Sequence, residues 1–142
     1  MSAASNYLEN KVLDHTLGNT AFTQPSTLYL GLFTNTSGSA AANLEAGTLT
    51  DEVSGGSYAR VNINVDGTSG AFNAASGGST SNTQTITFAA ATANWGTITH
   101  IAVLDASSSG NVLYWGAVTT SKTIESGDTF QVSAGNLTIS LA

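Results

Sequence analysis

The chain has 142 residues, a formal net charge of −6 at pH 7 and charged residues at only 8% of positions, against about 25% in an ordinary globular protein. Its three cations, Lys11, Arg60 and Lys122, are scattered along the sequence, which excludes the clustered positive charge that nucleic-acid binding needs. Cysteine is absent, which excludes disulfides and thiolate metal sites.

Hydroxyl and small residues replace the missing charges, with 18 Ser, 21 Thr and 15 Gly in the chain. The length predicts a single domain over residues 1–142, and the modest number of large apolar residues predicts a thin core. We therefore expect a domain that is stabilised partly by neighbours in an assembly, such as a homo-oligomer. No apolar run is long enough to cross a bilayer, and the first residues lack the pattern of a secretory signal.

The first predicted element is a helix over residues 5–17. Ser5 or Asn6 can cap it, Glu9 suits a capping box, and Gly18 suits its C-terminal end. We expect this short amphipathic helix to pack on its own β domain. The alternative is that it projects outward as an assembly element, which makes Asn6, Tyr7 and Lys11 candidate interface residues.

After Pro25, the run from Thr27 to Phe33 is apolar on both faces and predicts a buried strand. Residues 34–56 are rich in Ser, Ala and Gly and predict a long loop, a feature that is usually functional or mobile. Residues 58–65 then alternate between apolar and polar side chains, as in a strand with one solvent-exposed face. In this prediction Ala59, Val61, Ile63 and Val65 point inward, while Tyr58, Arg60, Asn62 and Asn64 point outward.

A short strand is predicted at 85–88, and the last third of the chain, 94–141, predicts an antiparallel meander. Its strands are expected at 96–104, 112–118, 129–133 and 137–141, separated by turns rich in Gly, Asn, Asp and Ser. The fold class that follows is mainly β. We expect an antiparallel β-sandwich of about seven or eight strands with one short N-terminal α-helix.

Motifs with possible chemistry are few. Gly55-Gly56 could expose backbone N–H groups to an anion, but the pair lacks a phosphate-loop sequence and predicts a turn. Residues 105–111 have oxygen-bearing side chains at alternate positions, as at the start of a calcium-binding loop. They lack the distal glutamate of such a loop, and the segment predicts a hairpin turn. His100 is expected to be a half-buried strand residue. We predict no catalytic residue, no metal site and no cofactor, and hence no enzyme.

Large aromatic side chains offer a different kind of site. Trp, Tyr and Arg are over-represented at the energetic centres of protein interfaces. Tyr58 and Arg60 on their outward strand face, together with Trp95, are therefore candidate interface residues. For Trp95, the alternative is that the side chain closes the entry of a strand.

Several blocks resemble a family of small structural proteins of tailed bacteriophages, variously labelled minor tail, tail-fibre-like or head-decoration proteins. The blocks share their order with the family and span nearly the whole chain: SNYLENKVLDH (5–15), LYLGLFT (28–34), EVSGGSYAR (52–60), NWGTITH (94–100), LYWGA (113–117), KTI (122–124) and GDTF (127–130). Residues 35–51 depart from the pattern, being longer and richer in Ala and Leu.

The resemblance implies a non-enzymatic virion protein that is made in the bacterial cytoplasm and acts on the capsid surface or tail. Our first hypothesis is a capsid decoration (cement) protein that binds the major capsid protein on the outer lattice. The alternative is a minor tail or tail-fibre-associated protein that contacts other tail proteins. A third hypothesis, from a different class, is a module that binds host glycans. Neither nucleic acid nor a membrane is expected as a partner.

Overall fold

The computed structural model describes residues 3–64 and 72–141. These residues contain nine strands and two helices. In chain order they are β1 (Ala3–Ala4), α1 (Asn6–Thr16), β2 (Tyr29–Phe33), α2 (Ala40–Glu45), β3 (Val61–Asn62), β4 (Ser79–Ser81), β5 (Ile86–Thr87), β6 (Gly96–Leu104), β7 (Val112–Ile124), β8 (Gln131–Val132) and β9 (Thr138–Ser140). The strands pair antiparallel throughout. The predicted fold class, mainly β with antiparallel strands and a short N-terminal helix, is therefore confirmed.

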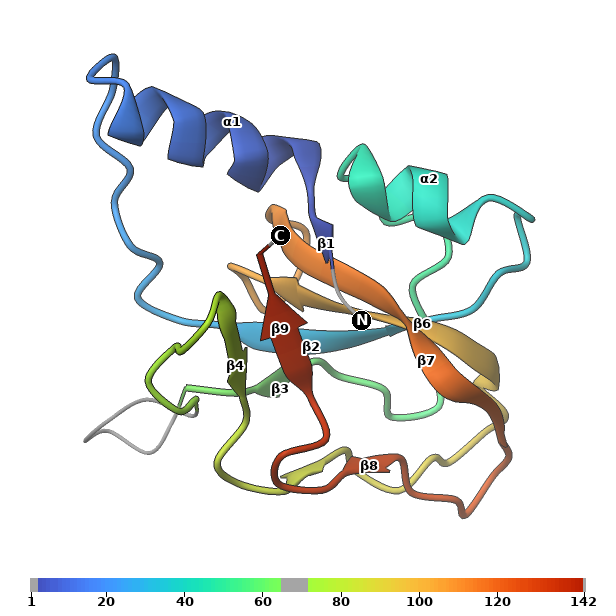
Figure 1. Cartoon of the computed structure of the whole chain (residues 1–142). Helices are drawn as coiled ribbons and strands as arrows, with labels where there is room; N and C mark the ends of the chain where they lie inside the picture. Colours follow the sequence, from blue (N-terminus) through green and yellow to red (C-terminus); the bar gives the residue numbers. More distant parts are fainter. Residues whose placement is uncertain (1–2, 65–71, 142) are drawn as a thin grey trace.

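The strands form one large sheet and two small ones. The large sheet has five strands in the order β1-β7-β6-β2-β3, while β4 pairs with β9 and β5 with β8. The two small sheets lie together on one side of the large sheet, as Figure 1 shows for β9, β4 and β8 in front of and below β2. Two layers of strands thus enclose the main core.

Alternation along β6 assigns its two faces to different clusters. Val103 belongs to the main core, which also contains Phe88, Phe130 and Ile139 from the small-sheet layer and the segments flanking it. Its neighbours Ala102 and Leu104 belong to a second cluster with Leu44 of α2. Because successive strand residues point to opposite faces, α2 covers the face of the large sheet that is opposite to the small sheets.

Residues 34–56 were predicted to form a long loop. The structure corrects this prediction, because the segment contains α2. The buried carboxylate of Asp51 organises this segment. It accepts hydrogen bonds from the Ser37 backbone N–H at 2.9 Å and the Ser37 hydroxyl at 2.6 Å, and from the Asn43 amide at 3.2 Å. Burial of Ala40 and Leu44 on the sheet supplies the apolar contact that a helix of this length needs.

The predicted strand at 58–65 is shorter than expected, since β3 covers only Val61–Asn62. Ile63 is buried as predicted, but Ala59 is exposed. The alternation fails before β3 because Ser57 has a positive φ of 63°, which interrupts the extended backbone. The prediction for Val65 lies outside the described residues.

β6 coincides with the predicted strand, whereas β7 continues six residues beyond its predicted end at Val118. The intervening turn forms as predicted, with the Asn111 N–H donating to Asp105 Oδ1 at 2.7 Å and with a positive φ at Gly110.

α1 is anchored at its first turn. Ser5 is fully buried, its N–H donates to the Leu113 carbonyl at 2.9 Å, and its hydroxyl donates to the Val112 carbonyl and accepts from the Leu8 N–H. Leu8 is the buried residue of this helix. Figure 1 shows the helix running from β1 away from the sheet.

Candidate functional site

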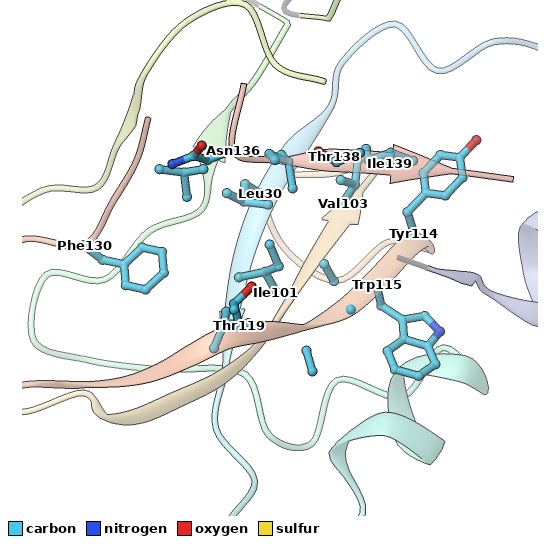
Figure 2. Close-up of a pocket in the computed structure, with 16 residues that line it drawn as sticks. Leu30, Ile101, Val103, Tyr114, Trp115, Thr119, Phe130, Asn136, Thr138 and Ile139 are labelled. Carbon is cyan, nitrogen blue, oxygen red and sulfur yellow. The ribbon is translucent and has the colours of Figure 1, made fainter. Parts of the chain in front are cut away.

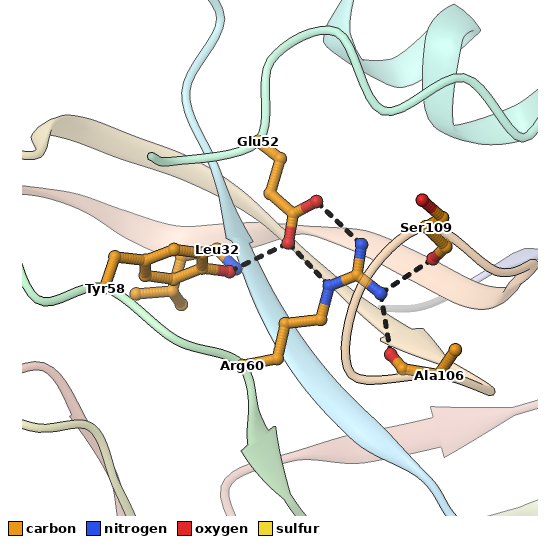
Figure 3. Close-up of polar contacts among 6 residues, drawn as sticks. All are labelled: Leu32, Glu52, Tyr58, Arg60, Ala106 and Ser109. Carbon is orange, nitrogen blue, oxygen red and sulfur yellow. Dashed lines mark hydrogen bonds and ion pairs between the residues drawn. The ribbon is translucent and has the colours of Figure 1, made fainter. Parts of the chain in front are cut away.

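Arg60, predicted to face solvent, is buried with 9% of its surface exposed. Its Nε donates to Glu52 Oε1 at 2.6 Å and its Nη2 to Glu52 Oε2 at 2.7 Å, while Nη1 donates to the carbonyls of Ala106 and Ser109 at 2.7 and 2.8 Å. Figure 3 shows the guanidinium between the carboxylate and the two carbonyls. The prediction that Arg60 points outward is therefore wrong.

The physical reason is that each of the three guanidinium nitrogens donates to a partner inside the molecule. A bidentate carboxylate and two carbonyl oxygens satisfy the hydrogen-bond donors of a buried arginine, which offsets the cost of taking its charge out of water. The contacts also tie the segment before β3 to the turn between β6 and β7. Arg60 is thus a brace within the fold and not part of a free surface.

Tyr58 belongs to the same network. Its hydroxyl donates to Glu52 Oε1 at 3.1 Å and accepts from the Leu32 N–H at 2.9 Å. Burial raises the pKa of this phenol well above its usual range, so it stays protonated as a donor. The outward prediction for Tyr58 is wrong too, because its ring packs against the main core.

Trp95 is buried, with 5% of its surface exposed. Its ring meets the Tyr58 ring edge-on at a centroid distance of 5.5 Å, and its Nε1–H donates to the Gly56 carbonyl at 2.9 Å. A Cβ on Gly56 would lie 2.9 Å from that nitrogen, so the glycine permits the close approach. Trp95 is therefore a buried side chain directly before the start of β6, in agreement with the alternative that it closes the entry of a strand. The prediction that it is an interface residue is wrong.

The candidates on α1 have a different environment. Asn6 is exposed, and Tyr7 and Lys11 are half-buried, with Lys11 Nζ lying 5.7 Å from the Tyr7 ring centroid. Beyond them the helix and the Leu17 residue that follows it expose apolar side chains, with 55% of Leu13 and 79% of Leu17 accessible. The α1 candidates lie on a separate element from Tyr58, Arg60 and Trp95, which are linked to one another through Glu52 and the Tyr58 ring.

Groups suited to chemistry do not converge. His100 is half-buried, as expected, and its Nδ1 lies 2.9 Å from the Thr99 hydroxyl; burial lowers its pKa, against a smaller opposing effect of Asp51. Within residues 3–64 and 72–141, no three His, Cys, Asp or Glu side chains gather as metal ligands. No helix in these ranges has the length and apolar character needed to cross a membrane.

The sequence reasoning missed a cleft between the two strand layers. Its volume is about 290 Å³, and it is lined by side chains of β2, β6 and β7 on one side and of the small-sheet layer on the other. Figure 2 shows Leu30, Ile101 and Val103 on the large sheet opposite Phe130 and Ile139. Its polar lining includes Thr119, Asn136 and Thr138. The one sequence feature related to this cleft is that β6 has apolar residues on both faces.

Comparison with known protein families shows a match over nearly the whole chain. The family described as podophage GP4 fiber I protein gp80 matches residues 3–140. Among curated proteins, none matches the chain. The family match spans every strand and both helices, so it bears on the whole fold and not on a single motif.

Proposed function

Because the chain belongs to the podophage GP4 fiber I protein gp80 family, a family of phage structural proteins, we propose that it is a non-enzymatic component of the virion's tail-fibre apparatus. The family match over residues 3–140 is the observation that carries this proposal. The proposed location is the virion, and the proposed partners are other tail proteins of the same particle.

The arrangement of the polar groups supports a structural role. The ion pair of buried Arg60 and half-buried Glu52 is engaged in contacts that hold turns together. The buried carboxylate of Asp51 is engaged in the same way. A surface rich in Ser and Thr and poor in charge suits permanent contact with neighbouring proteins, because few ions must be desolvated when such surfaces meet.

Capsid decoration, the first hypothesis from the sequence, finds no specific support in the family description. The tail-fibre alternative agrees with that description at least as well, and for this reason we favour it. Assembly as a homo-oligomer remains part of the proposal.

The test is the copy number of this chain in purified particles, measured by quantitative mass spectrometry against the major capsid protein. A tail-fibre component should be present at a small number of copies per particle, and immunogold labelling should place it at the tail. A copy number that matches the positions of the capsid lattice, with label over the head, would overturn the tail-fibre proposal in favour of decoration. Absence from purified particles would overturn both.

A further inference from the structure

The outer edge of β7 is largely unpaired. On its inner side β7 pairs with β6 from Val112 to Ile124. On its outer side β1 pairs only with Trp115 and Tyr114. Among the described residues, no strand pairs with this edge beyond Trp115, from Gly116 to Ile124. The edge therefore accepts a strand in one place and presents open backbone groups in the next.

A bulge lies in the middle of this open stretch. Ile98 is opposite Lys122 and His100 is opposite Ala117, so a single β6 residue, Thr99, faces the four β7 residues 118–121. Extra residues in a bulge leave the regular ladder. Bulges and lysines also serve to protect exposed edges from indiscriminate pairing, and this is the competing interpretation of the bulge and of Lys122.

The cleft next to this edge favours a binding site over an edge that is only protected from pairing. Residues 116–119 of β7 line the cleft, together with Leu30, Ile101 and Val103 of the large sheet. Ile101 lies on β6, with strands on both sides, yet it is only half-buried. The second layer thus leaves an opening, lined by both apolar and polar side chains, directly beside an unpaired strand edge (Figure 2).

We propose that the open edge of β7 and this cleft together form a docking site for an extended β-segment of another virion protein. Such a segment would pair its backbone with β7 beyond Trp115 and place alternate apolar side chains in the cleft. Main-chain pairing and side-chain pockets of period two are the two elements of strand-addition recognition. β1 already occupies the adjoining part of the same edge in this manner.

The charge on β7 points to a different protein and not to a second copy of this chain. Lys122 is the charged residue of the strand and is exposed. β7 contains no Asp or Glu, so the β7 edge of a second copy would place no opposite charge beside Lys122 in any register, whereas opposite charges on neighbouring strands favour pairing. The segment that fits is apolar at alternate positions and neutral or acidic opposite Lys122.

The test uses the purified chain and short overlapping synthetic peptides that span the other structural proteins of the same particle, with binding followed by fluorescence anisotropy. Val118→Asp, which places a carboxylate in the cleft, and Thr120→Pro, which removes an N–H in the bulge, should each weaken binding of the selected peptide at least about tenfold. The matched controls are Val118→Ile, which keeps an apolar side chain at the same position, and Thr120→Val, which keeps the backbone N–H. Both should bind like the parent chain.

Three results would overturn the inference: no peptide binds, the selected peptide binds Val118→Asp and Thr120→Pro as it binds the parent, or sedimentation shows a dimer that Val118→Asp dissociates. The last result would assign the edge to a second copy. Circular dichroism of each variant establishes that a lost signal is not a lost fold. The inference rests on the proposed virion role, but the copy number in particles tests that role independently of any peptide.

Discussion

At the scale of single residues, burial of polar groups decides what this protein can do. Glu52, Tyr58 and Arg60 would be a plausible contact patch if they faced water, but their polar atoms bind one another and the carbonyls of Ala106 and Ser109. A buried ion pair of this kind stabilises the fold only while both partners are present, because either charge alone would be buried without compensation.

Arg60→Met should therefore lower the free energy of unfolding by about 3 kcal/mol, since it leaves the Glu52 carboxylate and two carbonyls without their donor. Urea titration followed by circular dichroism measures the change. The double variant Glu52→Gln/Arg60→Met should recover part of the loss, because it removes the uncompensated charge. A loss below about 1 kcal/mol for Arg60→Met would show that the pair is exposed in solution.

His100 should make stability depend on pH. Burial lowers its pKa below the ordinary value of 6.5, so on acidification the unfolded chain takes up the proton first and the folded state loses stability. The contribution is present above the unfolded pKa and is lost as pH falls toward the lowered folded pKa. Between about pH 7.5 and pH 5, His100→Gln should lose less stability than the parent. Equal losses in the two proteins, measured by thermal unfolding, would assign the pH dependence to other groups.

At the scale of elements, the two helices show how little of a short helix need be buried. α1 is fixed by the Ser5 cap and by Leu8, while its later turns leave Leu13 and Leu17 exposed. α2 is held from the other side by Asp51 and by the burial of Leu44 on the sheet.

This difference along α1 gives a matched pair of substitutions. Leu8→Ala should lower the free energy of unfolding by about 2–5 kcal/mol, because it opens a cavity in the main core. Leu13→Ala removes the same atoms from an exposed position and should change it by less than about 0.5 kcal/mol. Similar losses in urea titrations of the two variants would mean that the last turns of α1 are covered in solution.

At the scale of the whole molecule, the main core joins segments from both ends of the chain. Leu8, Leu30, Phe88 and Ile139 belong to a single buried cluster, and α2 closes a second cluster against the same large sheet. The large sheet is thus shared by both cores, which couples its two faces.

We predict that the isolated chain unfolds as one cooperative domain, because the large sheet contributes residues to both core clusters. Trp95 lies in the main core and Trp115 packs on the second cluster. In Trp95→Phe and Trp115→Phe variants, the remaining tryptophan's fluorescence and the far-ultraviolet circular dichroism should follow one urea transition. Separate midpoints for the two tryptophans would show that the second cluster unfolds on its own.

The sequence by itself determined the strands with strong local patterns, a helix start at Ser5 or Asn6, the hairpin turn at residues 105–111 and the phage structural family. Each depends on neighbours in the chain or on the order of whole blocks. Side-chain direction at Tyr58, Arg60 and Trp95, the helix within 34–56 and the cleft beside β7 were decided only by the tertiary structure. Their physical causes are partners far away in sequence: Arg60 Nη1 reaches carbonyls 46 and 49 residues away, and no local periodicity encodes such contacts.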